Sequence, residues 1–214
     1  MTRTSRHYRE PVDSKAEQKK FALIFGTPNT NDEDDEYMQI CFCGTHGTGK
    51  TTLMWEVVKW MQKDIGLPAV PCAESSRDPL LDVHDSNYEE FLIKKRASIF
   101  NHFGHFVSDR SLFDPLAYQK IVRGYIDKDL MDFAFSFSKD QILFYVPIKF
   151  ELESDGVRPV GEEYQQKVQN VLIKVLERSN KKYYTVTRSD LIERLEFVKH
   201  VVMYREGWKD KLSL

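Results

Sequence analysis

The sequence predicts an α/β domain built on a five-stranded parallel sheet with helices on its faces. Two observations lead to this prediction. From about residue 37 onward, short apolar segments alternate with longer segments of helical periodicity, a pattern typical of parallel sheets because each crossover between parallel strands is usually a helix. The second observation is a glycine-rich loop at residues 44–52, which lies between the first strand-like segment and the first helical one.

The first two elements enclose that loop. Residues 38–43 are short and apolar, as expected of a buried strand. Residues 50–63 are predicted to form a helix, because Leu53, Val57 and Met61 lie four apart and so share one helical face. The order strand, glycine loop, helix is therefore present.

The remaining elements follow the same alternation. A short strand is predicted at 69–73, although Pro71 weakens it because proline cannot donate a ladder hydrogen bond. Apolar runs predict further strands, and the longer periodic stretches predict helices. The strands are expected at 106–108, 141–146 and 183–186, and the helices at 86–103, 115–124, 160–179 and 189–204.

The loop fits the pattern G-x-x-x-x-G-K-[ST], which is typical of phosphate-binding loops (P-loops). Its glycines allow positive φ, so that successive N–H groups can turn inward toward phosphate oxygens. Lys50 supplies a cation for the β- and γ-phosphates, and Thr51 a hydroxyl for Mg²⁺. A helix that begins near Lys50 points its positive end at the same place. ATP and Mg²⁺ are thus the expected ligands, bound by Gly44, Thr45, His46, Gly47, Thr48, Gly49, Lys50, Thr51 and Thr52.

Composition indicates an ordinary soluble protein. The 214 residues are 41% hydrophobic and 30% charged, with a net charge of -2, which is no general signal for nucleic-acid binding. No apolar run is long enough to cross a membrane, and the first residues lack the apolar stretch of a secretory signal. Three cysteines in no metal-binding pattern favour a reducing, cytoplasmic location. We expect residues 1–36 to be a polar, partly disordered extension and residues 37–214 to be the domain that contains the P-loop.

Charged residues follow three of the predicted strands, where ligands of open α/β sheets bind. Asp109 follows strand three, at the position of an acid that holds Mg²⁺ through water. In a phosphoryl transfer from ATP, Arg110 can hold either the acceptor molecule or the transferring phosphate. Glu74 and Arg77 follow strand two; Glu74 is a candidate base for the acceptor hydroxyl, or it pairs with Arg77 and holds the loop. Arg158 follows strand four beside a glycine and a proline, which suits a lid that closes over ATP.

The chain resembles the P-loop kinases, nearest the AAA-type ATPase/kinase branch that holds the nicotinamide riboside kinase domain, with many members from phages. The resemblance covers residues 38 to about 200 and implies a P-loop NTPase fold with strand order 2-3-1-4-5. The Asp-Arg-Ser element also resembles deoxynucleoside and thymidylate kinases, in which the arginine touches the substrate. The matching segments are Gly44–Leu53, Glu74–Arg77, Ser108–Tyr118 and Asp155–Arg158.

Three functions fit this sequence. The resemblance implies transfer of the ATP γ-phosphate to a nucleoside-like or nucleotide acceptor, whose site would include Glu74, Arg77 and Arg110. A kinase that acts on a modified base or an end within DNA is an alternative, for which the basic residues of the first twenty positions would form an arm. The third is an NTP-driven switch without an acceptor. The identity of the acceptor and the choice between monomer and homodimer stay open.

Overall fold

The structure of the chain is a computed structural model, and it describes residues 36–73, 85, 87–148 and 161–212. The N-terminal extension therefore lies outside the described residues, apart from Glu36. Glu74, Arg77 and Arg158 also lie outside them.

The sheet is the predicted one. Its five strands are all parallel, and their order is β2-β3-β1-β4-β5, as the sequence implied. Each predicted strand is present, and its bounds differ from the prediction by at most one residue at either end. The strand with proline lies at the edge of the sheet, where a missing N–H costs least. The strands are β1 (Gln39–Cys43), β2 (Val70–Cys72), β3 (Phe106–Ser108), β4 (Ile142–Tyr145) and β5 (Tyr183–Thr185).

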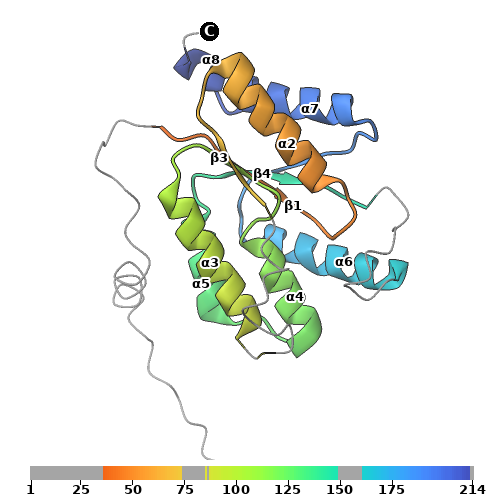
Figure 1. Cartoon of the computed structure of the whole chain (residues 1–214). Coiled ribbons are helices and arrows are strands. Elements are labelled where there is room, and N and C mark those ends of the chain that lie inside the picture. Colours follow the sequence, from red (N-terminus) through yellow and green to blue (C-terminus); the bar gives the residue numbers. More distant parts are fainter. Residues whose placement is uncertain (1–35, 74–84, 86, 149–160, 213–214) are drawn as a thin grey trace, which may run out of the picture.

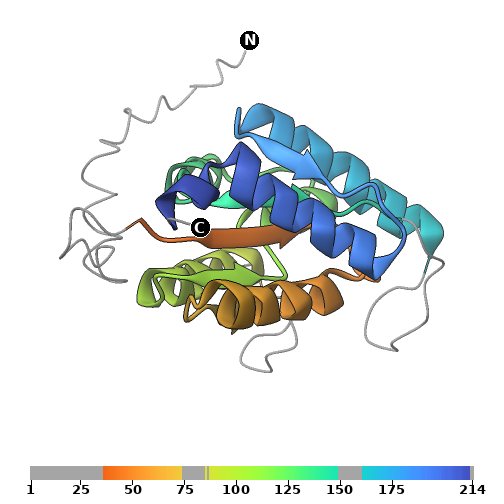
Figure 2. The same cartoon turned by 90° about the horizontal axis from the view of Figure 1, so that it is seen from above.

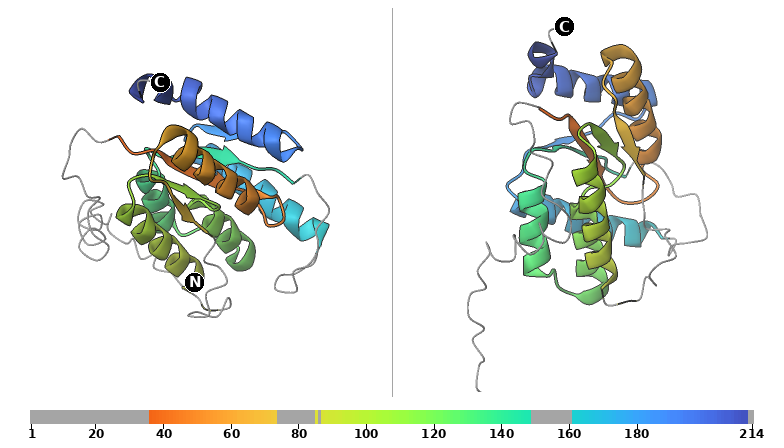
Figure 3. Two further views of the ribbon diagram at one scale, coloured as in Figure 1. Left: turned by 45° about the horizontal axis from the view of Figure 1, so that its top comes forward. Right: turned by 60° about the vertical axis from the view of Figure 1, so that its left-hand side comes forward.

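Helices cover both faces of the sheet and make a three-layer sandwich (Figure 1, Figure 3). One face carries α2 (Lys50–Trp60), α7 (Leu191–His200) and α8 (Trp208–Lys211). In Figure 2 this face is turned toward the viewer, with α2 in orange and α7 in blue, and the two helices contact each other. The other face carries α3 (Tyr88–His102), α4 (Phe113–Arg123), α5 (Lys128–Phe137) and α6 (Glu162–Arg178).

The side chains of β1 divide between the two layers. Ile40 and Phe42 join the apolar core beneath α2 and α7, whereas Cys41 and Cys43 join the core beneath α3 to α6. This division follows from the period of two along a strand. Because both faces are covered, β1 is apolar from Ile40 to Cys43, and it lies at the centre of the sheet.

The helices differ from the prediction in several places. Helices α5 and α8 were not predicted; Asp127 caps α5 by accepting hydrogen bonds from the backbone N–H groups of Asp129 and Leu130, 2.9 and 3.0 Å long. Helix α4 begins at Phe113, so that Pro115 lies in its first turn, where no N–H is needed. Helices α2 and α7 each continue into one π-helical turn, Met61–Ile65 (η1) and Val201–Arg205 (η2). Among the helices described here, none has the length and apolarity needed to span a membrane.

The three cysteines are free thiols in the core. Burial raises the pKa of Cys41 and of Cys43 well above the ordinary value of 9.0. Burial also raises the pKa of Cys72 to about 12. Above pH 9 the thiol of the unfolded chain releases its proton, whereas the buried thiol of the folded chain keeps it. The contribution of the thiol to stability is therefore fully present below pH 9 and is lost as the pH rises above 9.

We therefore expect the free energy of unfolding to fall as the pH rises from 9 toward 12. Each buried thiol should contribute about 1.4 kcal/mol per pH unit in that window. Urea unfolding curves between pH 7 and pH 11 measure this slope. The Cys72→Ala variant is the control, and its curve should be shallower by the share of one thiol. Parallel curves for the two proteins would contradict this account.

Candidate functional site

The loop at residues 44–52 connects the end of β1 to the beginning of α2 and has the backbone that the sequence predicted. Gly44, Gly47 and Gly49 all have positive φ, at 146°, 72° and 81°. Gly44 also lies so close to β4 that an added Cβ would be 2.4 Å from the carbonyl oxygen of Val146. Glycine is thus required at Gly44 both by φ and by space.

The carbonyl groups of this loop are bound from outside the loop, by side chains of three different helices or the turns before them. The Gly44 carbonyl accepts a 2.6 Å hydrogen bond from Arg110, in the turn before α4. The His46 carbonyl accepts a 2.7 Å bond from the amide of Gln165, in α6. The Thr48 carbonyl accepts a 2.9 Å bond from Arg194, in α7. These three supports come from residues 66, 119 and 146 positions away.

Other loop carbonyls are satisfied by the loop itself and by its neighbours. The Thr45 carbonyl accepts from the Lys50 ammonium and from the Thr48 hydroxyl, the latter bond being 3.1 Å long. The Gly49 carbonyl accepts the first helical bond of α2, from the N–H of Leu53 at 3.1 Å. The five carbonyls from Gly44 to Gly49 named here therefore each have a hydrogen-bond donor.

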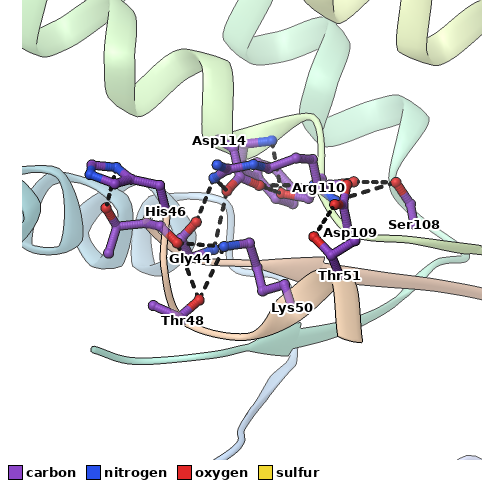
Figure 4. A network of polar contacts seen from close by, with 12 residues as sticks. Gly44, His46, Thr48, Lys50, Thr51, Ser108, Asp109, Arg110 and Asp114 are labelled. Carbon is purple, nitrogen blue, oxygen red and sulfur yellow. Dashed lines mark hydrogen bonds and ion pairs between the residues drawn. The ribbon is translucent and has the colours of Figure 1, made fainter. Parts of the chain in front are cut away.

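Lys50 lies across the loop. Its buried ammonium donates to the Thr45 carbonyl and, at 3.1 Å, to the Thr48 hydroxyl (Figure 4). Both acceptors belong to the loop, so the loop itself holds the cation in place.

Thr51 and Asp109 meet at the edge of the loop. The Thr51 hydroxyl donates a 2.7 Å hydrogen bond to the Asp109 carboxylate (Figure 4). The backbone N–H of Asp109 in turn donates to the carbonyl of Cys72 at 3.2 Å, which ties the end of β3 to β2. A hydroxyl and a carboxylate are the hard oxygen ligands that Mg²⁺ prefers, and Mg²⁺ commonly takes one or two carboxylates together with substrate phosphates. This pair therefore fits the ion.

Arg110 binds the loop. The sequence predicted that Arg110 contacts the acceptor or the transferring phosphate. In the structure its guanidinium is buried and donates to the Gly44 carbonyl and the Asp114 carboxylate, 2.6 and 3.1 Å away. Contact between Arg110 and a substrate stays a prediction.

Asp114, Gln165 and Arg194 were not among the predicted site residues, yet all three contact the loop. Asp114 accepts a 3.1 Å hydrogen bond from the N–H of Gly44. The sequence could have suggested Asp114 as a site residue only through its position five residues after Asp109, at the beginning of the next helix. Gln165 and Arg194 are ordinary polar residues on helices, and no local pattern distinguishes them.

The side chain of His46 packs inward. Its Nδ1 is 3.3 Å from the Thr45 hydroxyl, and its ring lies 6.4 Å from that of Tyr164, between centroids. Another histidine, His105, is used structurally, because its Nδ1 accepts a hydrogen bond from the N–H of Met38. Among the residues that the structure describes, no group of three His, Cys, Asp or Glu side chains is arranged as a metal site.

Comparisons with known proteins agree with this geometry. The family model described as an AAA domain matches residues 90–194, slightly less than half of the chain; this span excludes the loop but includes Asp109, Arg110 and Arg194. Among solved structures, the chain is similar to thymidylate kinase from Ehrlichia chaffeensis, with a TM-score of 0.54 and 20% identity over 77% of this chain and 98% of that one. A search of curated proteins found no match.

The fold is therefore that of the P-loop NTPases, in a kinase-like form. The order of the strands, the phosphate-binding loop after the central strand and the acid after the neighbouring strand all belong to this class.

The Gly44→Ala variant tests the close approach of the loop to β4. We expect it to lose about 1–3 kcal/mol more stability than Gly124→Ala, because it adds a steric clash to an unfavourable φ. Gly124 also has a positive φ, 76°, but open space around its Cβ position, so this second variant measures the cost of a left-handed backbone without a clash. Chemical denaturation of both variants gives the difference. Equal losses would mean that the neighbouring carbonyl moves aside.

Proposed function

We propose that this protein is an ATP-dependent phosphotransferase that moves the γ-phosphate of ATP to a hydroxyl or a phosphate of a nucleoside-like or nucleotide substrate. The observation that supports this most is the 2.7 Å contact between Thr51 and Asp109 beside a complete phosphate-binding loop. It joins two protein oxygens at the place where the β- and γ-phosphates would enter. Nucleotide binding and a metal-holding acid are thus combined in one site.

The chain's own residues would do three things in this reaction. The N–H groups of the loop would bind the β-phosphate oxygens, and the beginning of α2 would add its positive end. Lys50 would leave its loop acceptors for the β/γ bridge and neutralise charge that grows in the transition state. Thr51 and Asp109 would hold Mg²⁺, which supplies charge neutralisation across the β- and γ-phosphates when bound.

The acceptor side is proposed from the sequence. Glu74 would take the proton of the acceptor hydroxyl, Arg77 and Arg110 would hold the acceptor, and Arg158 would come from a lid over ATP. Of these residues the structure describes Arg110, whose Nη1 donates both to the Gly44 carbonyl and to the Asp114 carboxylate. Base catalysis would contribute about 10²–10⁴-fold, since positioning and electrostatics supply most of the acceleration.

The nature of the acceptor decides between the proposed function and its alternatives. Thymidylate kinase, to which the fold is similar, names thymidylate as the first compound to test. A transfer assay with labelled ATP would include nucleosides, nucleoside monophosphates, nicotinamide riboside and DNA. Label on a nucleoside or nucleotide supports the proposal. Label on DNA alone favours the DNA kinase, and hydrolysis without transfer favours the switch.

The Lys50→Ala variant should lose at least about 10²-fold in kcat, the usual cost of removing one electrostatic contact to a transition state. Lys59→Ala is the matched control, because Lys59 lies on the same helix but is exposed and pairs with Glu56. Initial rates with ATP and the best acceptor give the comparison. A Lys50→Ala enzyme with near-normal activity would remove the loop from the proposed mechanism.

The Asp109→Asn variant should need about 10–100-fold more Mg²⁺ for half-maximal rate and should have a lower kcat, because the amide is a weaker metal ligand than the carboxylate. The measurement is a Mg²⁺ titration of the rate at saturating ATP. Asp129→Asn, at the exposed beginning of α5, is the control for a lost negative charge. An unchanged Mg²⁺ requirement in Asp109→Asn would place the metal elsewhere.

A further inference from the structure

One ion pair binds both backbone polar groups of a single residue, Gly44, at the entrance of the loop. The Asp114 carboxylate accepts from the N–H of Gly44 at 3.1 Å, and Arg110 donates to the carbonyl of Gly44 at 2.6 Å. The two side chains also bind each other at 3.1 Å, and they are only 2% and 4% exposed. The direction of the Gly44 residue is therefore set by one pair of side chains (Figure 4).

The Asp114 carboxylate is itself fixed by four donors. Its Oδ1 accepts from Gly44 and Arg110, and its Oδ2 accepts from the N–H and the hydroxyl of Ser111 at 2.8 and 2.7 Å. The Ser111 carbonyl is held in turn by Arg96 of α3, at 3.0 Å. A carboxylate with this many donors has a single favourable orientation.

The segment from Asp109 to Asp114, which connects β3 to the first turn of α4, contacts the loop at its two ends. Arg110 and Asp114 bind Gly44 at the entrance, and Asp109 binds Thr51 at the exit. This short segment therefore links the two ends of the phosphate-binding loop by hydrogen bonds. A change at Gly44 would be transmitted to the position of Thr51 relative to Asp109.

We propose that the Arg110–Asp114 pair is a positioning pair that sets the entrance of the phosphate-binding loop relative to the Asp109 carboxylate. Neither side chain needs to touch the nucleotide for this role. Buried ion pairs seldom add net stability compared with apolar replacements, so the expected function of this pair is geometric. The part of the proposal that concerns catalysis rests on the proposed function.

Helix α4 provides a matched control pair at its other end. Arg123 binds Glu89 of α3 at 2.7 Å, with the two side chains 16% and 3% exposed. Arg123 lies nine residues after Asp114, which is roughly 14 Å along a helix. Loss of either pair should destabilise the same helix, but only the Asp114 pair reaches the loop.

The experiment compares Asp114→Asn with Glu89→Gln. An asparagine cannot accept all four donors of the Asp114 site, because its Nδ2 is itself a donor. In Asp114→Asn we expect kcat to fall about 10²-fold, the effect of a misplacement of about 1 Å, and the Mg²⁺ requirement to rise about tenfold. Glu89→Gln should lose stability, with kcat and the Mg²⁺ requirement within about twofold of wild type for the folded enzyme. Equal losses of activity in both variants, or none in Asp114→Asn, would overturn the proposal.

Two readouts do not depend on phosphate transfer. The amide hydrogen of Gly44 should exchange faster in Asp114→Asn and at the wild-type rate in Glu89→Gln, as measured by NMR. Tripolyphosphate binding without Mg²⁺, measured by calorimetry, should weaken at least about fivefold in Asp114→Asn alone. If the wild-type protein transfers phosphate to no acceptor, the proposed function fails, and these two readouts still decide the positioning role.

A milder variant covers the case in which Asp114→Asn does not fold. Arg110→Lys keeps the cation beside Asp114 but gives up the reach of the guanidinium to the carbonyl of Gly44. We expect a smaller change in the same direction, a rise of about threefold in the Mg²⁺ requirement together with weaker tripolyphosphate binding. Wild-type values for both in folded Arg110→Lys would overturn the positioning role.

Discussion

A loop that offers its N–H groups to phosphate must place its carbonyls elsewhere, and buried carbonyls need donors. This constraint governs the site. The carbonyls of Gly44, His46 and Thr48 are each bound by a side chain from a different part of the fold. Because each unsatisfied buried carbonyl would cost about 1–3 kcal/mol, these donors are part of what makes the loop conformation stable in the folded protein.

The strand order makes this support possible. β1 lies at the centre of the sheet, with β3 on one side and β4 on the other. The turn after β3 therefore reaches the entrance of the loop, while α6, which follows β4 in the chain, reaches its middle. Helix α7, which follows β5, reaches its far end. A loop after an edge strand would have neighbours on one side only, so the central position of β1 is a requirement of the site as well as of the core.

The sequence was sufficient for the features that depend on near neighbours. Glycines at fixed spacing predicted the loop, and apolar periodicity predicted all five strands within one residue at either end. Helix α5 was missed because its first positions mix acidic and aromatic residues and its capping Asp127 resembles an ordinary loop residue. The hydrogen bonds of that cap, which the sequence alone does not reveal, mark the beginning of the helix.

Side-chain direction was the part that sequence reasoning could not supply. Arg110 was expected to face a substrate because it follows an acid at a strand end. In the structure its guanidinium donates hydrogen bonds to buried groups of the protein, the Gly44 carbonyl and the Asp114 carboxylate. Gln165 and Arg194 contact the loop across 119 and 146 residues. Such contacts depend on how whole helices pack on the sheet, and a single sequence holds no local pattern for them.

The chemistry of arginine explains why that residue type occurs at the far end of the loop. Arg194 donates through two nitrogens to two backbone carbonyls, those of Thr48 and Arg188, at 2.9 and 2.8 Å. These carbonyls belong to the phosphate-binding loop and to the connection between β5 and α7, so the rigid guanidinium fork fixes the spacing of two separate loops. Burial lowers the pKa of Arg194 from its ordinary value of 12.5. A lysine buried at the same place would have a lower starting pKa, a single nitrogen and a flexible stem. It would therefore hold the two loops less firmly and would lose its charge more readily than Arg194.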